Sequence, residues 1–349
     1  MDFFLPATIS FIITVLIIPP TIKLAKKFNL VDNPKLRPHP AHIQNRIVPR
    51  IGGLPIFTAL FLTILIFTPF EKETVGILIG LIILIIIGIM DDKFQNLSPY
   101  IRLVSQFFAA LAIVISGVGI NFITNPLGGI LHLDIIEFLP SILAVFWIVW
   151  VMNMINWSKG VDGQMPGIVT VSAITLGLLS LKLTTQQDLS QENIAKLSFI
   201  TAGSAFGLLI FNWHPAKIFP GFSGSTILGF MLAVLAILSG AKLATLGLVL
   251  LIPATDFAYT FFRRILQGKS PVWGDRGHLH HKLLEKGFTH QQISLFYILG
   301  SVILGAVALN LSSQDKLFAA SLIAGILLGT ILWLNFFGGL SKQSDPDNG

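Results

Sequence analysis

The stretch Ile77 to Met90, ILIGLIILIIIGIM, decides the fold class, because it is apolar on every face of any helix or strand it could form. A transmembrane β-strand would alternate apolar and polar residues, whereas a helix satisfies its own backbone hydrogen bonds in lipid. Across the whole chain of 349 residues, 53% are hydrophobic, 11% are charged and the mean hydropathy is +0.79. Soluble domains carry about 25% charged residues, so a soluble globular protein is excluded.

Apolar runs close to the length that crosses a bilayer core of about 30 Å recur along the chain. Eleven candidate spans follow, at residues 3–22, 52–69, 75–90, 101–120, 138–153, 165–182, 195–211, 222–239, 242–262, 292–311 and 317–337. The sequence therefore predicts an all-α, polytopic membrane protein, with one membrane domain over residues 1–340 and a disordered polar tail at 341–349. Only two residues precede the first run, so we expect it to be a retained span and not a cleaved signal.

Positive charge is distributed unevenly between the loops on the two sides of these spans. All but five of the 23 Lys and Arg residues fall on one side when the connections are alternated across the membrane. Cytoplasmic loops are enriched in Lys and Arg, so we expect the N-terminus outside and the C-terminus in the cytoplasm, in an inner (plasma) membrane. Topology and anionic lipid headgroups account for the net charge of +6, and no nucleic-acid partner is needed.

An acidic pair, Asp91 and Asp92, ends an Ile-rich span on the predicted cytoplasmic side. The helix dipole disfavours negative charge there by about 0.3–1 kcal/mol each, which suggests a use for the pair. The carboxylates could bind a divalent cation or deprotonate a nucleophile, and a plain interfacial turn is equally open. Arg102 and Gln106 follow one turn apart on the next helix and could bind phosphate, unless Arg102 only snorkels.

Three further polar stretches lie on the same side. Residues 153–163 could read a sugar or base through amides and glycines, and residues 211–226 place small residues where helix N–H groups could meet a phosphate. The histidines in 274–282 lack zinc-hydrolase spacing and lie among basic residues, which favours an anion clamp. Turns, caps and close packing are the structural alternatives.

Asp256 inside the ninth span is a functional candidate, or else pairs with a neighbouring helix. Because the chain has no cysteine, this chemistry must use oxygen and nitrogen ligands.

Six motifs occur in order and together resemble the polyprenyl-phosphate N-acetylhexosamine-1-phosphate transferases. The motifs are Arg50-Ile51-Gly52-Gly53, Met90-Asp91-Asp92 with Leu97-Ser98-Pro99, Val161-Asp162-Gly163, Phe211-Asn212 with Pro215-Ala216-Lys217, Gly221-Phe222-Ser223-Gly224-Ser225, and Asp275-Arg276-Gly277-His278-Leu279-His280-His281. The chain looks most like the branch that initiates O-antigen, enterobacterial common antigen or teichoic acid linkage units. The resemblance implies transfer of a sugar 1-phosphate, with GlcNAc as the expected sugar, from a UDP-N-acetylhexosamine to undecaprenyl or another polyprenyl phosphate. UMP is released, Mg²⁺ or Mn²⁺ is the cofactor, and the active site is cytoplasmic. A homodimer is compatible with the sequence.

The resemblance implies roles for individual residues, and Lys159, which departs from the family pattern, is added on the charge of its ammonium. Asp91, Asp92, Lys159 and Asp162 are the expected catalytic residues, and Asp91 and Asp92 are the expected, weak metal ligands. The expected substrate-binding residues are Arg50, Arg102, Asn153, Asn156, Asn212, Lys217, Ser223, Gly224, Ser225, Asp256, Arg276, His278, His280 and His281.

Two positions depart from the family pattern. Lys159 replaces the first Asp of the usual Asn-x-x-Asp-Gly-x-Asp-Gly, and Phe222 replaces the metal-binding Asp of the usual Gly-Asp-x-Gly-Ser. Mg²⁺ relies on few, well-placed protein oxygens, so we expect weakened metal binding, with Lys159 neutralising phosphate charge instead. The alternative is a non-catalytic homologue that binds polyprenyl phosphate or nucleotide sugar and has a regulatory role. A transporter is the least supported reading, because transporter sites lie near the midplane and no inverted repeat is seen.

Overall fold

The computed structural model describes residues 3–33, 46–95, 97–125, 128–184, 191–240, 242–270 and 277–336. The helices are α1 (Phe4–Lys27), α2 (Gly53–Phe67), α3 (Lys72–Phe94), α4 (Pro99–Ile115), α5 (Leu139–Trp157), α6 (Gln164–Thr184), α7 (Gln191–Asn212), α8 (Gly221–Leu238), α9 (Leu243–Val249), α10 (Leu251–Leu266), α11 (Leu279–Glu285), α12 (His290–Asn310) and α13 (Ser313–Phe336). Two short antiparallel pairs, β1 (Val31–Asp32) with β2 (Val48–Pro49) and β3 (Phe122–Thr124) with β4 (Ile130–His132), are the strands of the described ranges. The all-α class is therefore confirmed, and the expected polar tail at 341–349 lies outside the described residues.

Each of the eleven expected spans coincides with a helix or a bent helix pair. Among the described residues, eight helices are long and apolar enough to cross a membrane, and α9 with α10, bent by 85°, would make a ninth. The two others, α2 and α4, are shorter, with 15 and 17 residues. A helix of 15 residues rises about 22 Å, less than a full bilayer core. The positions of the spans are confirmed, and the number of crossings stays a prediction.

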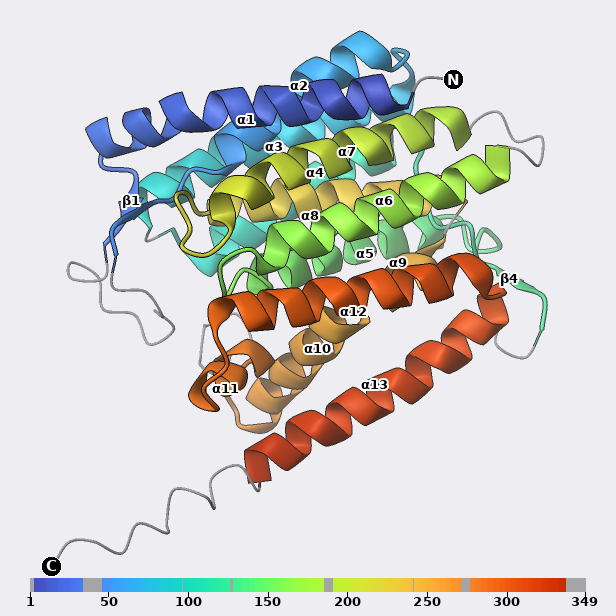
Figure 1. Ribbon diagram of the computed structural model, residues 1–349. Helices are drawn as coiled ribbons and strands as arrows, with labels where there is room; N and C mark the ends of the chain where they lie inside the picture. Colours follow the sequence, from blue (N-terminus) through green and yellow to red (C-terminus); the bar gives the residue numbers. More distant parts are fainter. Residues whose placement is uncertain are drawn as a thin grey trace, which may run out of the picture.

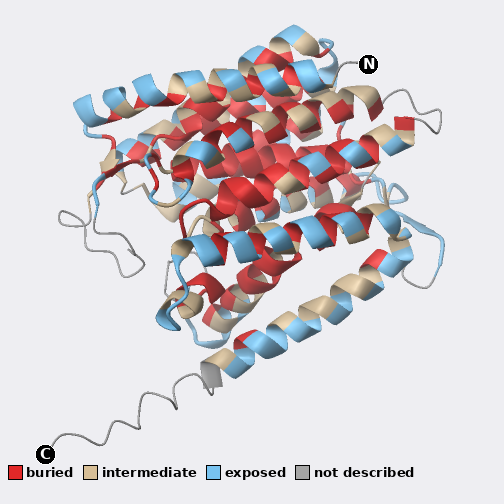
Figure 2. Cartoon of the chain, viewed as in Figure 1, coloured by how far each residue is buried: buried red, intermediate tan, exposed pale blue. Residues whose placement is uncertain are grey.

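Helix α8 forms the centre of the bundle and is buried along almost its whole length (Figures 1 and 2). Glycines on its neighbours let the backbones approach closely, the usual way in which membrane helices pack. A Cβ atom on Gly80 of α3 would lie 2.4 Å from the Phe230 ring, and one on Gly88 would lie 2.5 Å from the Ser223 Cβ. The beginning of α8 is thereby held against the end of α3.

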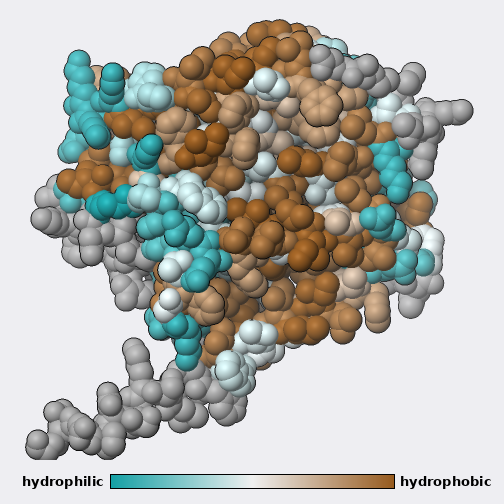
Figure 3. Space-filling view, in the orientation of Figure 1, coloured by the Kyte–Doolittle hydropathy of each residue, from teal (hydrophilic) through white to brown (hydrophobic). Residues whose placement is uncertain are grey.

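The bundle has two polar ends and an apolar band between them (Figure 3). One polar end carries β1, β2 and α11, and we call it the site end because the acidic pair Asp91–Asp92 ends α3 there (Figure 1). The opposite end, called the far end, carries the β3–β4 hairpin (Figure 1). Helix α1 begins at the far end, whereas α13 finishes at the site end (Figure 1). Opposite ends for the first and last helices agree with termini on opposite sides of a membrane.

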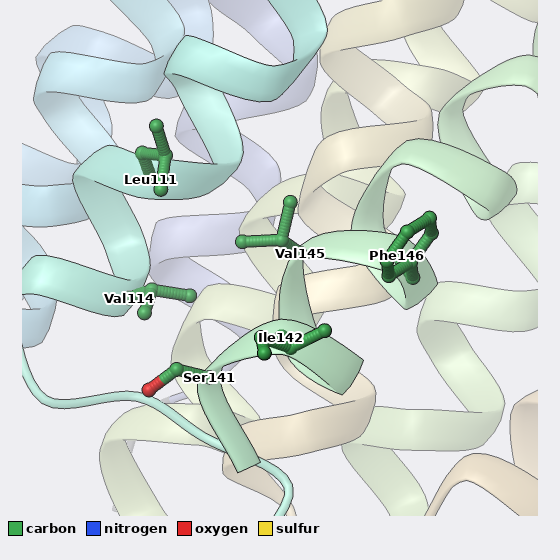
Figure 4. A pocket seen from close by; sticks show the side chains of 6 residues that line it. All are labelled: Leu111, Val114, Ser141, Ile142, Val145 and Phe146. Carbon is green, nitrogen blue, oxygen red and sulfur yellow. The ribbon is translucent and has the colours of Figure 1, made fainter. Parts of the chain in front are cut away.

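Two features lie on the outer surface of the helix bundle. Helix α13 is mostly exposed and packs against α9 and α10 (Figure 2). A shallow pocket of about 250 Å³ lies between α4 and α5 (Figure 4). Its lining residues are Leu111, Val114, Ser141, Ile142, Val145 and Phe146. Since the Ser141 hydroxyl is the single polar side-chain group in this lining, the pocket suits an apolar occupant and not a phosphate.

Candidate active site

The acidic pair occupies the last full turn of α3. Asp91 and Asp92 are both completely buried. Gln95 ends the helix in the left-handed conformation, and Ser98 caps α4 with Pro99 at its first position. Two adjacent carboxylates are therefore held inside the protein at a fixed helix end.

Asp92 binds the N-terminus of α8. Its carboxylate accepts hydrogen bonds from the Phe222 N–H at 2.7 Å, the Ser223 N–H at 3.3 Å and the Ser223 hydroxyl. The positive end of the α8 dipole favours this charge. Gly221 is required just before, because its φ is +71° and a Cβ there would lie 2.4 Å from an Asp92 oxygen. Of the two alternatives that the sequence leaves open for these N–H groups, the structure favours capping, since Asp92 already accepts from them.

Asp91 faces two arginines instead. Arg102 Nε lies 2.7 Å from Asp91 Oδ1, so Arg102 is an ion-pair partner and does more than snorkel. Arg50 lies between the two carboxylates, 3.9 Å from Asp91 and 3.6 Å from Asp92. Asp91 Oδ2 is buried and accepts no hydrogen bond from the part of the chain that the structure describes. The Arg50 guanidinium, 3.9 Å away, is the ion-pair partner of this oxygen.

Lys159 ties the end of α5 to the beginning of α8. Its ammonium donates to Asn156 Oδ1 at 2.6 Å and to the Gly221 carbonyl at 3.1 Å, and lies 3.5 Å from Ser225 Oγ. Burial, followed by repulsion from Arg50, lowers the pKa of Lys159 from 10.5 to about 7. The lysine therefore changes charge near neutral pH.

Phe222 closes one side of this cluster. Its buried ring packs against the Arg102 guanidinium, whose Cζ lies 5.6 Å from the ring centroid. The ring supplies no metal ligand, and the hydrogen bonds from α8 already occupy Asp92.

Charge around the acidic pair also opposes a metal ion. Three cationic side chains, Arg50, Arg102 and Lys159, act on the two carboxylates. Mg²⁺ needs several well-placed oxygens, and here Asp91 Oδ2 accepts no hydrogen bond within the described residues but lies 3.9 Å from the Arg50 guanidinium. These residues do not fit a tight Mg²⁺ site.

A second cluster surrounds Asp162. Asp162 Oδ2 accepts from the Ala216 N–H at 3.1 Å and lies 2.7 Å from His214 Nδ1 and 3.6 Å from Arg46. Asp162, His214 and His290 bring potential ligand atoms within 4.8 Å of one another, a spacing that could hold a metal ion. The Arg46 guanidinium opposes a cation there. His214 and His290 were not predicted, because their meeting depends on the contact between the loop after α7 and the start of α12.

Asn212 holds together the two loops that form this second cluster. Its side chain accepts from the Gly163 N–H at 3.0 Å and donates to the Ile218 carbonyl at 2.8 Å. Both groups of the amide are therefore used to hold two loops together. We interpret Asn212 as a positioning residue for Asp162 in this structure.

A third cluster joins α10 to α11. Asp256 accepts from the Leu279 N–H at 2.7 Å and lies 2.9 Å from His278 Nδ1. The rings of His278 and His280 are parallel, with centroids 5.4 Å apart, and His281 lies beside His280 at 4.4 Å. Burial, followed by repulsion from His278, lowers the pKa of His280 well below 6.5. A neutral His280 does not fit the expected anion clamp and suits hydrogen bonding or proton transfer.

The loop at residues 158–163 connects the three clusters. It carries Lys159 of the first and Asp162 of the second. Gly160 lies so close to the third that a Cβ there would be 1.9 Å from His280 Nε2. The expectation that distant polar loops meet at one end of the bundle is therefore confirmed.

Several predicted site residues have structural contacts. Asn153 of α5 donates to Gln106 of α4 at 2.7 Å, and Gly224 packs against Gly53. Lys217 is exposed, with its ammonium 6.0 Å from the Phe211 ring centroid. Arg276 lies outside the described residues.

One cation–π pair, Arg264 with Trp157, was not predicted from the sequence. The buried Arg264 guanidinium lies over the Trp157 ring, 4.7 Å from its centroid, and that ring also contacts His278. A basic residue in the last turn of a helix gives no sign of such a contact, because it depends on how α5 and α10 pack.

The chain is similar to a set of known transferases. The family model described as Glycosyl transferase family 4 matches residues 74–240. The chain is 32% identical over 343 residues to the probable undecaprenyl-phosphate N-acetylglucosaminyl 1-phosphate transferase of Bacillus subtilis, covering 95% of this chain and 87% of that protein. It is 28% identical over 317 residues to the decaprenyl-phosphate N-acetylglucosaminephosphotransferase of Mycolicibacterium smegmatis, covering 82% and 76%. It is also 28% identical over 293 residues to the undecaprenyl-phosphate alpha-N-acetylglucosaminyl 1-phosphate transferase of Escherichia coli K12, covering 82% and 77%.

The ion pair between Asp91 and Arg102 generates a stability prediction. Arg102→Met leaves Asp91 buried with a weakened counter-charge, so the free energy of unfolding should fall by about 2–3 kcal/mol, less than for a fully buried pair because Arg102 is 29% exposed. Adding Asp91→Asn should restore at least half of the loss, as measured by a double-mutant cycle in detergent. Lys93→Met, an exposed change on the same turn, serves as the control. Simple additivity of the two changes would contradict the pairing.

Proposed function

This chain belongs to glycosyl transferase family 4, and from that premise we propose that it transfers N-acetylglucosamine 1-phosphate from a UDP-sugar to undecaprenyl or a related polyprenyl phosphate, releasing UMP. One observation carries the proposal: a buried acidic pair lies among three cations at one end of a membrane bundle.

The reaction needs an oxygen of the lipid phosphate to attack the sugar-bearing phosphorus of the UDP-sugar. A new P–O bond forms to the lipid phosphate, the bond to the bridging diphosphate oxygen breaks, and UMP leaves with that oxygen. Asp91 Oδ2 is positioned to orient the lipid phosphate and to take its proton if it arrives protonated. Arg50, Arg102 and Lys159 balance the negative charge of the phosphates.

For the cofactor, we propose a weakened Mg²⁺ requirement. The described donor set does not fit a tight site, so none of the steps above depends on the ion. Fixed cations, with Lys159 foremost, would do part of the electrostatic work that a divalent ion performs in phosphoryl transfer.

The function is tested with purified protein in lipid nanodiscs containing undecaprenyl phosphate. We expect UMP release and a lipid-linked sugar with UDP-GlcNAc, measured against UDP-GalNAc and with or without EDTA. Asp91→Asn should lower kcat by about 10²-fold, the usual contribution of acid–base help. Asp315→Asn, an exposed carboxylate at the far end, is the matched control. Binding of lipid or nucleotide without any turnover would instead support a non-catalytic regulator.

Lys159 gives the reaction a pH dependence. Its ammonium is charged below pH 7 and neutral above it, because its pKa is about 7. As the pH rises from 6 to 8.5, kcat/KM should therefore fall by about tenfold beyond any general trend, since a cation that faces phosphate is lost. Lys159→Arg keeps its charge and should flatten this fall, whereas Lys159→Ala should lose about 2–4 kcal/mol of transition-state stabilisation at pH 6. Identical pH profiles for wild type and Lys159→Arg would refute the role.

We also propose that the site end faces the cytoplasm. The chain has no cysteine, so single cysteines report cleanly on topology. Lys93→Cys at the site end should resist a membrane-impermeant maleimide in right-side-out vesicles and react after permeabilisation. Asp134→Cys, beside the β3–β4 hairpin, should react at once. The reverse pattern would place the site end outside.

A further inference from the structure

Gln106 of α4 carries a buried hydrogen-bond donor that has no acceptor within the described part of the chain. The side chain is 1% exposed, and its Nε2 atom makes no hydrogen bond there. Leaving a buried donor unpaired is costly, and most buried polar groups in proteins are paired. An unpaired amide of this kind therefore points to an acceptor that the protein chain itself does not supply.

The contacts of Asn153 fix which end of the Gln106 amide is unpaired. The Val149 carbonyl can only accept, so the Asn153 atom that lies 2.8 Å from it is Nδ2. The same Nδ2 donates to Gln106 Oε1 at 2.7 Å. If the Gln106 amide turned over, two NH₂ groups would face each other. Asn153 thus holds the Gln106 amide with Oε1 toward α5 and leaves both N–H bonds of Nε2 unused.

Gln106 lies on the face of α4 that carries Arg102. Residues four apart on a helix are neighbours on its surface, with Cβ atoms about 5–6 Å apart. Arg102 Nε lies 2.7 Å from Asp91 Oδ1, so the unpaired amide is one helical turn from the cation of the acidic pair. Since α4 begins at the site end, Gln106 also lies about 6 Å deeper in the apolar band than Arg102.

We propose that Gln106 binds the phosphate of the lipid substrate, by donating from Nε2 to a phosphate oxygen beside Arg102. This inference rests on the proposed function, because it assigns the residue to one of the two substrates. An unpaired donor next to a cation suits an anion with several acceptor oxygens. The position one turn inside the apolar band favours the phosphate of a lipid over the diphosphate of a water-soluble nucleotide.

Binding at Gln106 requires neighbouring side chains to move, because Nε2 is covered by protein in this structure. Arg102 can do so, since it is 29% exposed and lies on the same face of α4. The Gln106 amide stays in place, because Asn153 and the Val149 carbonyl hold its other end. A fixed neutral donor and a more mobile cation then contact the same phosphate.

The test measures binding of undecaprenyl phosphate to the full-length protein in neutral detergent, without a UDP-sugar, from the rise in Tm with lipid concentration. Gln106→Met has a similar length and no amide, and it should weaken binding about tenfold, as expected for loss of a hydrogen bond to a charged group. Gln106→Glu keeps the acceptor for Asn153 and should lose at least as much affinity. Undecaprenol, which has no phosphate, should not distinguish Gln106→Met from wild type.

Ser105→Ala is the matched control on the same turn of α4. Ser105 is also buried, and its hydroxyl donates to the Arg102 carbonyl at 2.7 Å within the helix. This variant should bind undecaprenyl phosphate as wild type does. An equal loss of affinity in Ser105→Ala would show a general effect on α4 and would overturn the assignment of Gln106.

Kinetics in nanodiscs distinguish the two substrates. In Gln106→Met, KM for undecaprenyl phosphate should rise about tenfold, whereas KM for UDP-GlcNAc should stay within twofold. A rise in KM for UDP-GlcNAc alone would place the nucleotide diphosphate here and overturn the proposal. Unchanged lipid binding in both Gln106 variants would also overturn it and would indicate an internal water at Nε2.

The binding measurement also separates this inference from the proposed transferase activity. If wild type shows no turnover but binds undecaprenyl phosphate more tightly than Gln106→Met does, the role of Gln106 holds and the proposed function fails. If wild type turns over and both Gln106 variants bind the lipid equally well, the proposed function holds and the role of Gln106 fails. Absence of undecaprenyl phosphate binding by wild type would overturn both.

Discussion

The hydrogen bonds from the first turn of α8 to the Asp92 carboxylate are the contact on which the site depends. A buried charge is costly, but here two backbone N–H groups, a serine hydroxyl and the positive end of a helix dipole offset that cost. The same contact fixes the direction in which α8 begins. It thereby places Phe222 against Arg102 and presents the Gly221 carbonyl to Lys159.

Lys159 and Phe222, the two departures from the family pattern, both fit the environment of the acidic pair. A lysine is tolerated beside two carboxylates because its ammonium has nearby acceptors and adds a counter-charge. An aromatic ring in the first turn of α8 packs against the Arg102 guanidinium and supplies no ligand for a divalent ion. The two positions at which the family pattern has carboxylates therefore hold an ammonium and an aromatic ring. The positive charge of this site falls as the pH rises through about 7, because Lys159 loses its proton there.

Much of the fold could be predicted because the signals are local. Apolar runs set the positions of the spans, and the bias of Lys and Arg placed the polar loops at one end. What could not be predicted depends on contacts between distant segments. Asp92 satisfies N–H groups 130 and 131 positions away, and Asp162 meets His214 across 52 positions. The sequence leaves both a phosphate and a cap open as acceptors for those N–H groups, because nothing in it shows which acceptor reaches them first.

The connection between the three clusters follows from a single irregular segment. The rest of the site is carried by helix ends and by loops anchored to them, whereas residues 158–163 touch every cluster through Lys159, Gly160 and Asp162. Gly160 has no room for a side chain against His280, so the loop cannot shift without moving that ring. Lys159, Gly160 and Asp162 lie on one short loop, so a shift of its backbone at one cluster would move residues that contact the other two.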